Sequence, residues 1–142
     1  MLQQLAPGYI ETGKAKIVYN NFPVIGPESV SAAQAAECAG DQNKFWAYGD
    51  YLFAHQGNEN SGAFSIANLK AFAAQLGLDT QTFDACFDSG KYAGLVQQQF
   101  QAGQQRGVQA TPTFFINGQK YEGVLPYNQL SELIDAGQKA GQ

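Results

Sequence analysis

Residues 107–118 constrain the fold most, because they combine a proline, a short apolar run and a turn dipeptide. Thr113–Ile116 and Lys120–Val124 are rich in β-forming residues, and Asn117-Gly118 between them is a strong signal for a tight hairpin turn. Pro112 enters the first of these strands, and proline is tolerated at the first residue of a strand. The sequence therefore predicts a β-hairpin that begins at a proline.

The Thr111–Pro112 bond has two interpretations from the residues alone. In the trans form, which most X-Pro bonds adopt, Pro112 simply opens the strand. In the cis form the backbone turns sharply and leaves the amide and carbonyl of Thr111 free to pair with an extended peptide by strand addition. The general frequency of the two forms favours trans.

Helical periodicity dominates the rest of the chain. Ala15–Phe22 is the exception, because it alternates and is rich in β formers, which predicts a strand. Helices are predicted for residues 28–56 with a break at Gly40-Asp41, after the N-caps Ser65 and Asp79, over 91–105 and over 127–140. The order of a strand, several helices, a hairpin and a helix predicts an α/β domain with a helical insertion between its strands.

The composition of the chain excludes several classes of function. The 142 residues suffice for one domain, and 44% apolar residues allow a packed core. The net charge is −4 and the basic residues form no cluster, so nucleic-acid binding is not expected, and no apolar run has the length of a membrane span. One histidine and two cysteines cannot form an ordinary four-ligand zinc site without other donors. We expect no metal and no cofactor. Thiol chemistry is among the few enzyme chemistries left.

Several side chains of the helical region have competing interpretations. Phe45, Trp46 and Phe53 are predicted to be core aromatics, with one wall of a peptide groove as the alternative. Glu37 is expected to be solvated, although it lies in an apolar helix face and could instead sit beside an active site. His55 closes a predicted helix, which favours a capping or surface role over a proton relay.

The two cysteines stand on different predicted helices. The long separation of Cys38 and Cys86 excludes a CxxC motif, in which close thiols lower one pKa and create the attacking thiolate. A structural disulfide is our preferred prediction, and it would imply an oxidising compartment. Two buried reduced thiols and a functional redox pair are the alternatives.

Four motifs in order resemble DsbA-like thiol:disulfide oxidoreductases, a branch of the thioredoxin superfamily. In chain order these are Ala35–Ala39 with Lys44–Trp46 and Leu52-Phe53, then Phe87–Tyr92, Thr111–Gly118 and Gly123–Tyr127. The resemblance extends from about Leu5 to the end of the chain. It implies a thioredoxin-like fold in which residues 1–142 form a single domain with an α-helical insertion at about 28–106. It also implies a cis Thr111–Pro112 bond and favours the Cys38–Cys86 disulfide.

The same resemblance implies a function. Such proteins oxidise or isomerise disulfides in exported proteins, through a mixed disulfide formed by a low-pKa thiolate. Thr111 and Pro112 would align an extended or unfolded peptide substrate, and a redox partner protein would complete the cycle. The implied location is extracytoplasmic, in the periplasm, in the cell envelope or outside the cell, although residues 1–6 lack the regions of a signal peptide.

One departure from the family is severe. In such proteins a strand and a Cys-Pro-x-Cys-like motif precede the stretch that matches Leu2–Tyr9, and here nothing precedes Met1. Neither Cys38 nor Cys86 aligns with the nucleophile, so we assign no catalytic residue and expect no turnover by the chain as it stands. The N-terminal strand is expected to be missing from the sheet. The chain is then a truncated fragment, a natural non-catalytic peptide-binding or interaction module, or one partner of a homodimer or strand swap that restores the strand.

Overall fold

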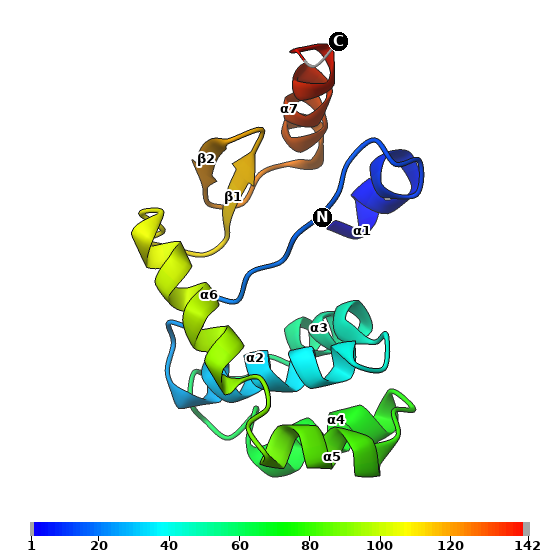
Figure 1. Ribbon diagram of the computed structural model, residues 1–142, viewed down its shortest axis with the longest axis vertical. Helices are drawn as coiled ribbons and strands as arrows, with labels where there is room; N and C mark the ends of the chain where they lie inside the picture. Colours follow the sequence, from blue (N-terminus) through cyan, green and yellow to red (C-terminus); the bar gives the residue numbers. More distant parts are fainter. Residues whose placement is uncertain (1, 141–142) are drawn as a thin grey trace. The chain divides into compact units, whose positions relative to one another are not determined.

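The computed structural model describes the backbone of residues 2–140 and the side chains of residues 4–138. Its elements are shown in Figure 1. In chain order they are α1 (Leu2–Leu5), the π-helical turn η1 (Ala6–Ile10), α2 (Pro27–Gly40), α3 (Phe45–Ala54), α4 (Ile66–Gln75), α5 (Thr80–Asp88), α6 (Ala93–Gln105), β1 (Thr113–Ile116), β2 (Gln119–Glu122) and α7 (Tyr127–Ala140).

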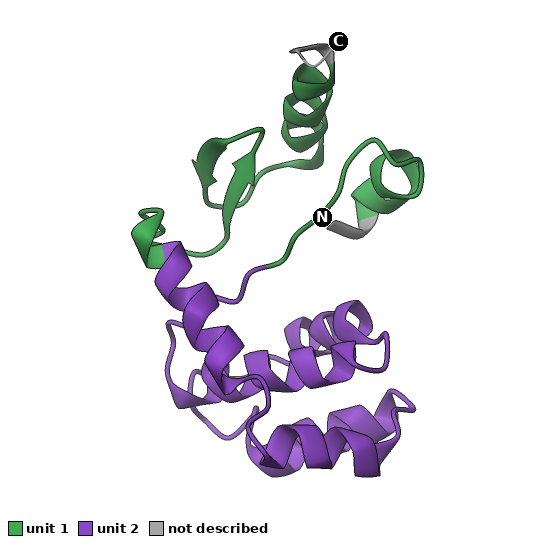
Figure 2. Ribbon diagram, in the orientation of Figure 1, with its two compact units in different colours: residues 1–19, 104–142 green, residues 20–103 purple. Residues whose placement is uncertain are grey.

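The described chain forms two compact units (Figure 2). The first, which we call the hairpin unit, consists of the residues up to 19 and from 104 onward, and it holds α1, η1, β1, β2 and α7. The second, which we call the helical unit, consists of residues 20–103 and holds α2 to α5 and most of α6. Each unit has a hydrophobic core of its own.

The core of the helical unit forms around the alanine-rich face of α2. Small side chains such as Ala35 and Ala39, both fully buried, allow the neighbouring helices to approach closely. Tyr48, Leu69 and Phe83 fill the space around them and are likewise fully buried. The Tyr48 hydroxyl donates to the Leu69 carbonyl at 2.7 Å, so the one polar group of this aromatic is satisfied inside the core.

Two helix starts in the helical unit agree with the sequence. The Ser65 side chain accepts the Asn68 amide at 3.4 Å before α4, and the Asp79 carboxylate accepts the Thr82 amide at 2.7 Å before α5. Side-chain acceptors of this kind satisfy N–H groups that have no partner in the first helical turn. Both predicted N-caps are therefore confirmed.

The hairpin unit is organised by the predicted turn. β1 and β2 run antiparallel with Phe114 opposite Tyr121, and Asn117 and Gly118 connect them with φ angles of 50° and 83°. Two successive positive φ angles are typical of the tight turn that matches the twist of a hairpin. The hairpin contributes Phe114, Ile116 and Tyr121 to the core of this unit. The other members of that core are Leu5, Tyr9, Ile10, Leu125, Leu130, Leu133 and Ile134.

Two sequence predictions are wrong. Ala15–Phe22 belongs to no strand, because within residues 2–140 the sheet has only β1 and β2, and a β-rich segment without a neighbouring strand has no ladder to join. Trp46 and Phe53 are not core aromatics, since 48% and 63% of their surfaces are exposed. Both belong to α3, in which Tyr48 is the buried residue, and a surface helix buries only one of its faces.

Candidate functional site

The loop of residues 106–112 joins α6 to β1 and ends in the Thr111–Pro112 peptide, which is cis. Both Thr111 and Pro112 are exposed. No hydrogen bond joins the backbone N–H or C=O of Thr111 to another residue of the described chain. The loop therefore presents an unpaired backbone amide and carbonyl at the head of a strand, as strand addition requires.

Contacts on both sides hold this loop in place. The Gly123 amide donates to the Pro112 carbonyl at 2.8 Å, and the Thr113 hydroxyl donates to the Ala110 carbonyl at 2.6 Å. The Lys120 ammonium donates to the Gly107 carbonyl at 2.9 Å. Fixed backbone of this kind lowers the ordering cost of binding an extended ligand.

Arg106, the first residue of this loop, stacks on the hairpin. Its guanidinium carbon lies 3.5 Å from the ring centre of Phe115, a short cation–π contact. Within residues 2–140 Arg106 forms no ion pair, whereas Lys120 on the neighbouring strand pairs with Glu122 at 2.9 Å. The stacked guanidinium thus keeps its N–H donors available.

Cys38 and Cys86 form a disulfide between α2 and α5, with their α-carbons 5.9 Å apart. Only 1% of Cys38 and 8% of Cys86 is exposed, and both belong to the core of the helical unit. These are the only cysteines of the sequence, so no free thiol remains. A buried disulfide of this kind is out of reach of a substrate thiolate.

A polar cluster that the sequence did not reveal lies where the helical unit begins and ends. The buried Asn21 side chain donates to Glu37 at 2.7 Å and to Gln99 at 2.8 Å, and its backbone amide also donates to Gln99. Next to it, Phe22 packs on Phe100 with ring centres 4.8 Å apart. Asn21 and Gln99 are far apart in sequence, and polar residues outside any motif give no signal of such a contact.

Glu37 itself is half-buried rather than solvated as expected. Burial raises the pKa of its carboxyl, and the hydrogen bonds from Asn21 and Gln99 counteract only part of that rise. The side chain lies within the helical unit and bonds to structural partners. A role in holding Asn21 in place accounts for its contacts.

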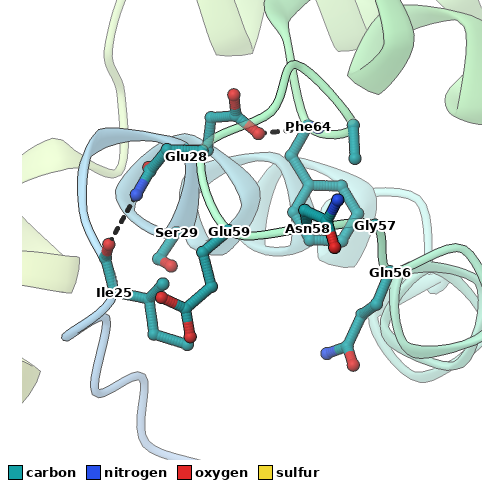
Figure 3. A pocket seen from close by; sticks show the side chains of 10 residues that line it. Ile25, Glu28, Ser29, Gln56, Gly57, Asn58, Glu59 and Phe64 are labelled. Carbon is teal, nitrogen blue, oxygen red and sulfur yellow. Dashed lines mark hydrogen bonds between the residues drawn. The ribbon is translucent and has the colours of Figure 1, made fainter.

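A shallow pocket of about 250 Å³ lies beside the start of α2 (Figure 3). Both carboxylate oxygens of Glu28 accept backbone amides, from Gly62 at 2.7 Å and from Phe64 at 3.0 Å, and the Asn60 amide donates to the Ile25 carbonyl at 2.7 Å. These bonds fix the α3–α4 loop on α2. The Glu28 carboxylate is therefore satisfied by the protein itself, and we assign no functional role to the pocket, which Glu59 also lines.

Residues 2–140, the part of the chain that the structure describes, show neither a metal site nor a membrane-spanning helix. No group of three or more histidine, cysteine, aspartate or glutamate side chains in this part of the chain has the arrangement of a metal site. None of its helices combines the length and apolar content needed to cross a bilayer.

Comparison with known proteins decides the family. A family model described as thioredoxin matches residues 1–136. The chain belongs to this thioredoxin family. The sequence-based prediction of the thioredoxin superfamily is thereby confirmed.

Solved structures confirm the thioredoxin-like fold. The chain superposes on oxidised BdbD from Bacillus subtilis with a TM-score of 0.85 at 22% identity, covering 98% of this chain and 77% of that one. It superposes on a thioredoxin-like oxidoreductase from Silicibacter pomeroyi with a TM-score of 0.71 at 26% identity, covering 86% of this chain and 68% of that one. The thioredoxin-like fold with inserted helices is therefore as predicted.

Curated relatives are much longer than this chain. A protein named Na(+)/H(+) antiporter NhaA 3 from Salinispora tropica is 33% identical over 121 residues, which are 84% of this chain and 18% of that protein. A protein named Na(+)/H(+) antiporter NhaA from Herminiimonas arsenicoxydans is 31% identical over 113 residues, 80% of this chain and 17% of that protein. The chain thus spans less than a fifth of the length of these relatives.

Proposed function

We propose that the chain is the peptide-positioning part of a DsbA-like thiol:disulfide oxidoreductase that acts on exported proteins. Membership of the thioredoxin family supports thiol–disulfide exchange as the chemistry. The unpaired backbone of Thr111, held at the head of β1 next to Pro112, is the observation that carries the proposal. Thr111 and Pro112 are the substrate-binding residues in this proposal, because an extended peptide can pair with the free amide and carbonyl.

The reaction needs a thiolate that attacks one sulfur of a disulfide, forms a mixed disulfide and releases the other sulfur as a thiolate. Cys38 and Cys86 are joined to each other and buried, so they offer no such thiolate. We therefore assign them a structural role and no catalytic residue to this chain. The chain as it stands orients a peptide without turnover, and a separate CxxC has to supply the reactive sulfurs.

Peptide binding can be tested at Thr111 directly. A reduced, alkylated unfolded protein should shift the backbone NMR signals of residues 110–113. T111P, which removes the Thr111 amide proton, should abolish these shifts, whereas T111A keeps the proton and should retain them. Equal binding by both folded variants would contradict the proposal.

Turnover can be tested by insulin reduction. The chain itself should show no activity, and a fusion that adds a strand ending in a CxxC motif should gain it. Clear activity of the unmodified chain that is lost in C38S or C86S would contradict the structural role of these cysteines.

A non-catalytic peptide-binding or interaction module is the second candidate, favoured by the absence of any free cysteine. Peptide binding at Thr111 together with an inactive, folded CxxC fusion would support this second candidate over the first. The transport activity in the names of the antiporter relatives is not proposed for this chain, since the chain matches less than a fifth of their length.

We further propose an extracytoplasmic location, because buried disulfides are typical of oxidising compartments. Alkylation of intact cells followed by a gel-shift assay should find Cys38 and Cys86 fully oxidised. We also propose that residues 1–142 form one domain with its helical insertion at about 28–106, and that a redox partner protein or a second copy completes the working assembly. Limited proteolysis and light scattering test these two points.

A further inference from the structure

One side chain anchors the turn of the hairpin to α7. The Asn117 side-chain nitrogen donates to the Leu133 carbonyl at 3.0 Å. In a regular α-helix this carbonyl also accepts the backbone amide of Gly137, four residues later, so Asn117 uses its second lone pair. All of these residues belong to the hairpin unit, where Ile116 and Leu133 share one hydrophobic core. The turn and the helix are therefore held together by a polar contact in addition to a packed core.

Gly137 provides the space for this contact. A β-carbon at position 137 would overlap the side-chain amide of Asn117, so only glycine leaves that amide beside the helix. The overlapping atoms are the far end of a flexible side chain, and G137A would therefore displace the amide without requiring the backbone to shift. We call this position of the Asn117 amide, bonded to Leu133 and lying against Gly137, the seated position.

Asn117 also lies in a reactive dipeptide, since it is the only asparagine of the chain that glycine follows. In such a dipeptide the Gly118 backbone nitrogen can lose its proton and attack Cγ, the side-chain carbonyl carbon of Asn117. A bond forms between this nitrogen and Cγ, the bond from Cγ to the side-chain nitrogen breaks, and ammonia leaves with the proton. Water then opens the cyclic succinimide at either carbonyl and yields isoaspartate or aspartate. Gly118 has no β-carbon to hinder the attack, and Asn117 is exposed to water.

We propose that Asn117 is a deamidation site whose reaction the seated position controls. The ring closes only when Cγ turns towards the Gly118 nitrogen, and a side-chain amide bonded to α7 is not free to turn. The seated asparagine is therefore protected, and conversion follows release of the turn from α7. A hydrogen bond of this kind accounts for about fivefold in the ratio of seated to released side chains. The inference does not rest on the proposed redox function.

A converted side chain cannot return to the seated position. The product is a carboxylate, which has no N–H to donate to the Leu133 carbonyl and brings a negative charge next to that oxygen. Isoaspartate also lengthens the main chain by one carbon, within a turn of two residues that sets Ile116 opposite Gln119. The turn of a converted chain therefore stays detached from α7, and the modification permanently marks chains whose turn has opened.

The rate of conversion tests the protection. The unmodified chain, G137A and a blocked peptide of residues 114–121 are incubated in mildly alkaline buffer, and conversion is followed by peptide mass mapping and isoaspartyl methyltransferase labelling. The peptide has the same Asn-Gly dipeptide without α7 and gives the unprotected rate. The unmodified chain should convert at least about fivefold more slowly than the peptide, and G137A about fivefold faster than the unmodified chain. G49A, whose added β-carbon on α3 would meet no atom within 4 Å, is the matched control and should convert at the unmodified rate.

The N117D variant tests the detachment of the turn and does not depend on the folding of G137A. It has the side chain of the aspartate product, so the amide NMR signals of Leu133 and Gly137 should shift, whereas those of α2 in the helical unit should not.

Two results would overturn the protection: conversion of the unmodified chain at the rate of the peptide, and equal rates in G137A and G49A. Unchanged NMR signals of Leu133 and Gly137 in N117D would overturn the detachment of the turn.

Discussion

Breaking the Cys38–Cys86 disulfide should lower the stability of the chain by about 4 kcal/mol. The bond closes a loop with a sequence separation of 48 between helices α2 and α5. In the chain-entropy model a cross-link over such a loop removes about 14 cal/mol/K from the unfolded state, which gives that figure at 25 °C. Reduction leaves both sulfurs in the core, so it measures the cross-link without adding a cavity.

The assay is urea unfolding followed by circular dichroism, with and without a thiol reductant, on the unmodified chain and on C38A/C86A. The reduced chain should unfold at a lower urea concentration and with a larger m-value, because its unfolded state exposes more surface. C38A/C86A should unfold at a lower urea concentration than the oxidised chain, both with and without the reductant, and its midpoint should not change when the reductant is added. It also controls for effects of the reductant itself.

The burial of the two sulfurs adds a kinetic expectation. Since 1% of Cys38 and 8% of Cys86 is exposed, reductant should leave the bond intact in the native protein and should cut it only when the chain unfolds. A reduced chain within about 1 kcal/mol of the oxidised one would refute the cross-link argument. Rapid reduction of the folded protein without urea would refute the structural role.

Three further changes probe the packing and charge of the helical unit. G103A should destabilise the protein although alanine favours helices, because the added β-carbon would lie 2.7 Å from the Phe22 ring. G49A, whose added β-carbon would have no atom within 4 Å, should instead stabilise the protein by about 0.5–1 kcal/mol in the same urea assay. Y48F should cost about 1 kcal/mol, because it removes the buried hydrogen bond to the Leu69 carbonyl, and an unchanged midpoint would show that this bond contributes nothing. Burial raises the pKa of Glu37 in the folded state, so its contribution to stability is complete at low pH and declines as pH rises through that pKa. E37Q should therefore gain stability relative to the unmodified chain as pH rises above about 4, and a variant that becomes less stable relative to the unmodified chain as pH rises would contradict the assignment.

Local signals predicted much of the fold. Ser65 and Asp79 cap their helices, and Asn117-Gly118 forms the hairpin turn, because each of these signals acts between residues close in sequence. Ala15–Phe22 carries an equally clear strand pattern and still forms no strand. A strand needs a partner as well as a pattern, and no second β-rich segment of the described chain lies alongside it.

The sequence also indicated where the proposed binding residues lie in the fold. The exposed Thr111 and Pro112 stand where the family motif placed them, at the head of β1. The stacking of Arg106 on Phe115 and the bonds of Asn21 to Glu37 and Gln99 were not predicted. Both depend on the folding of segments that carry no motif, so only the three-dimensional structure reveals them.

The contacts of Asn21 and Phe22 with Gln99 and Phe100 have a consequence for how the chain is assembled. They bring the first residues of the helical unit next to α6 near the end of that unit, so the two ends of residues 20–103 lie close together. A module whose two ends meet can be inserted, exchanged or excised without redirecting the polypeptide on either side. We therefore expect that residues 20–103 can be exchanged as one segment between relatives of this chain, because the contacts of Asn21 with Gln99 and of Phe22 with Phe100 move with the segment.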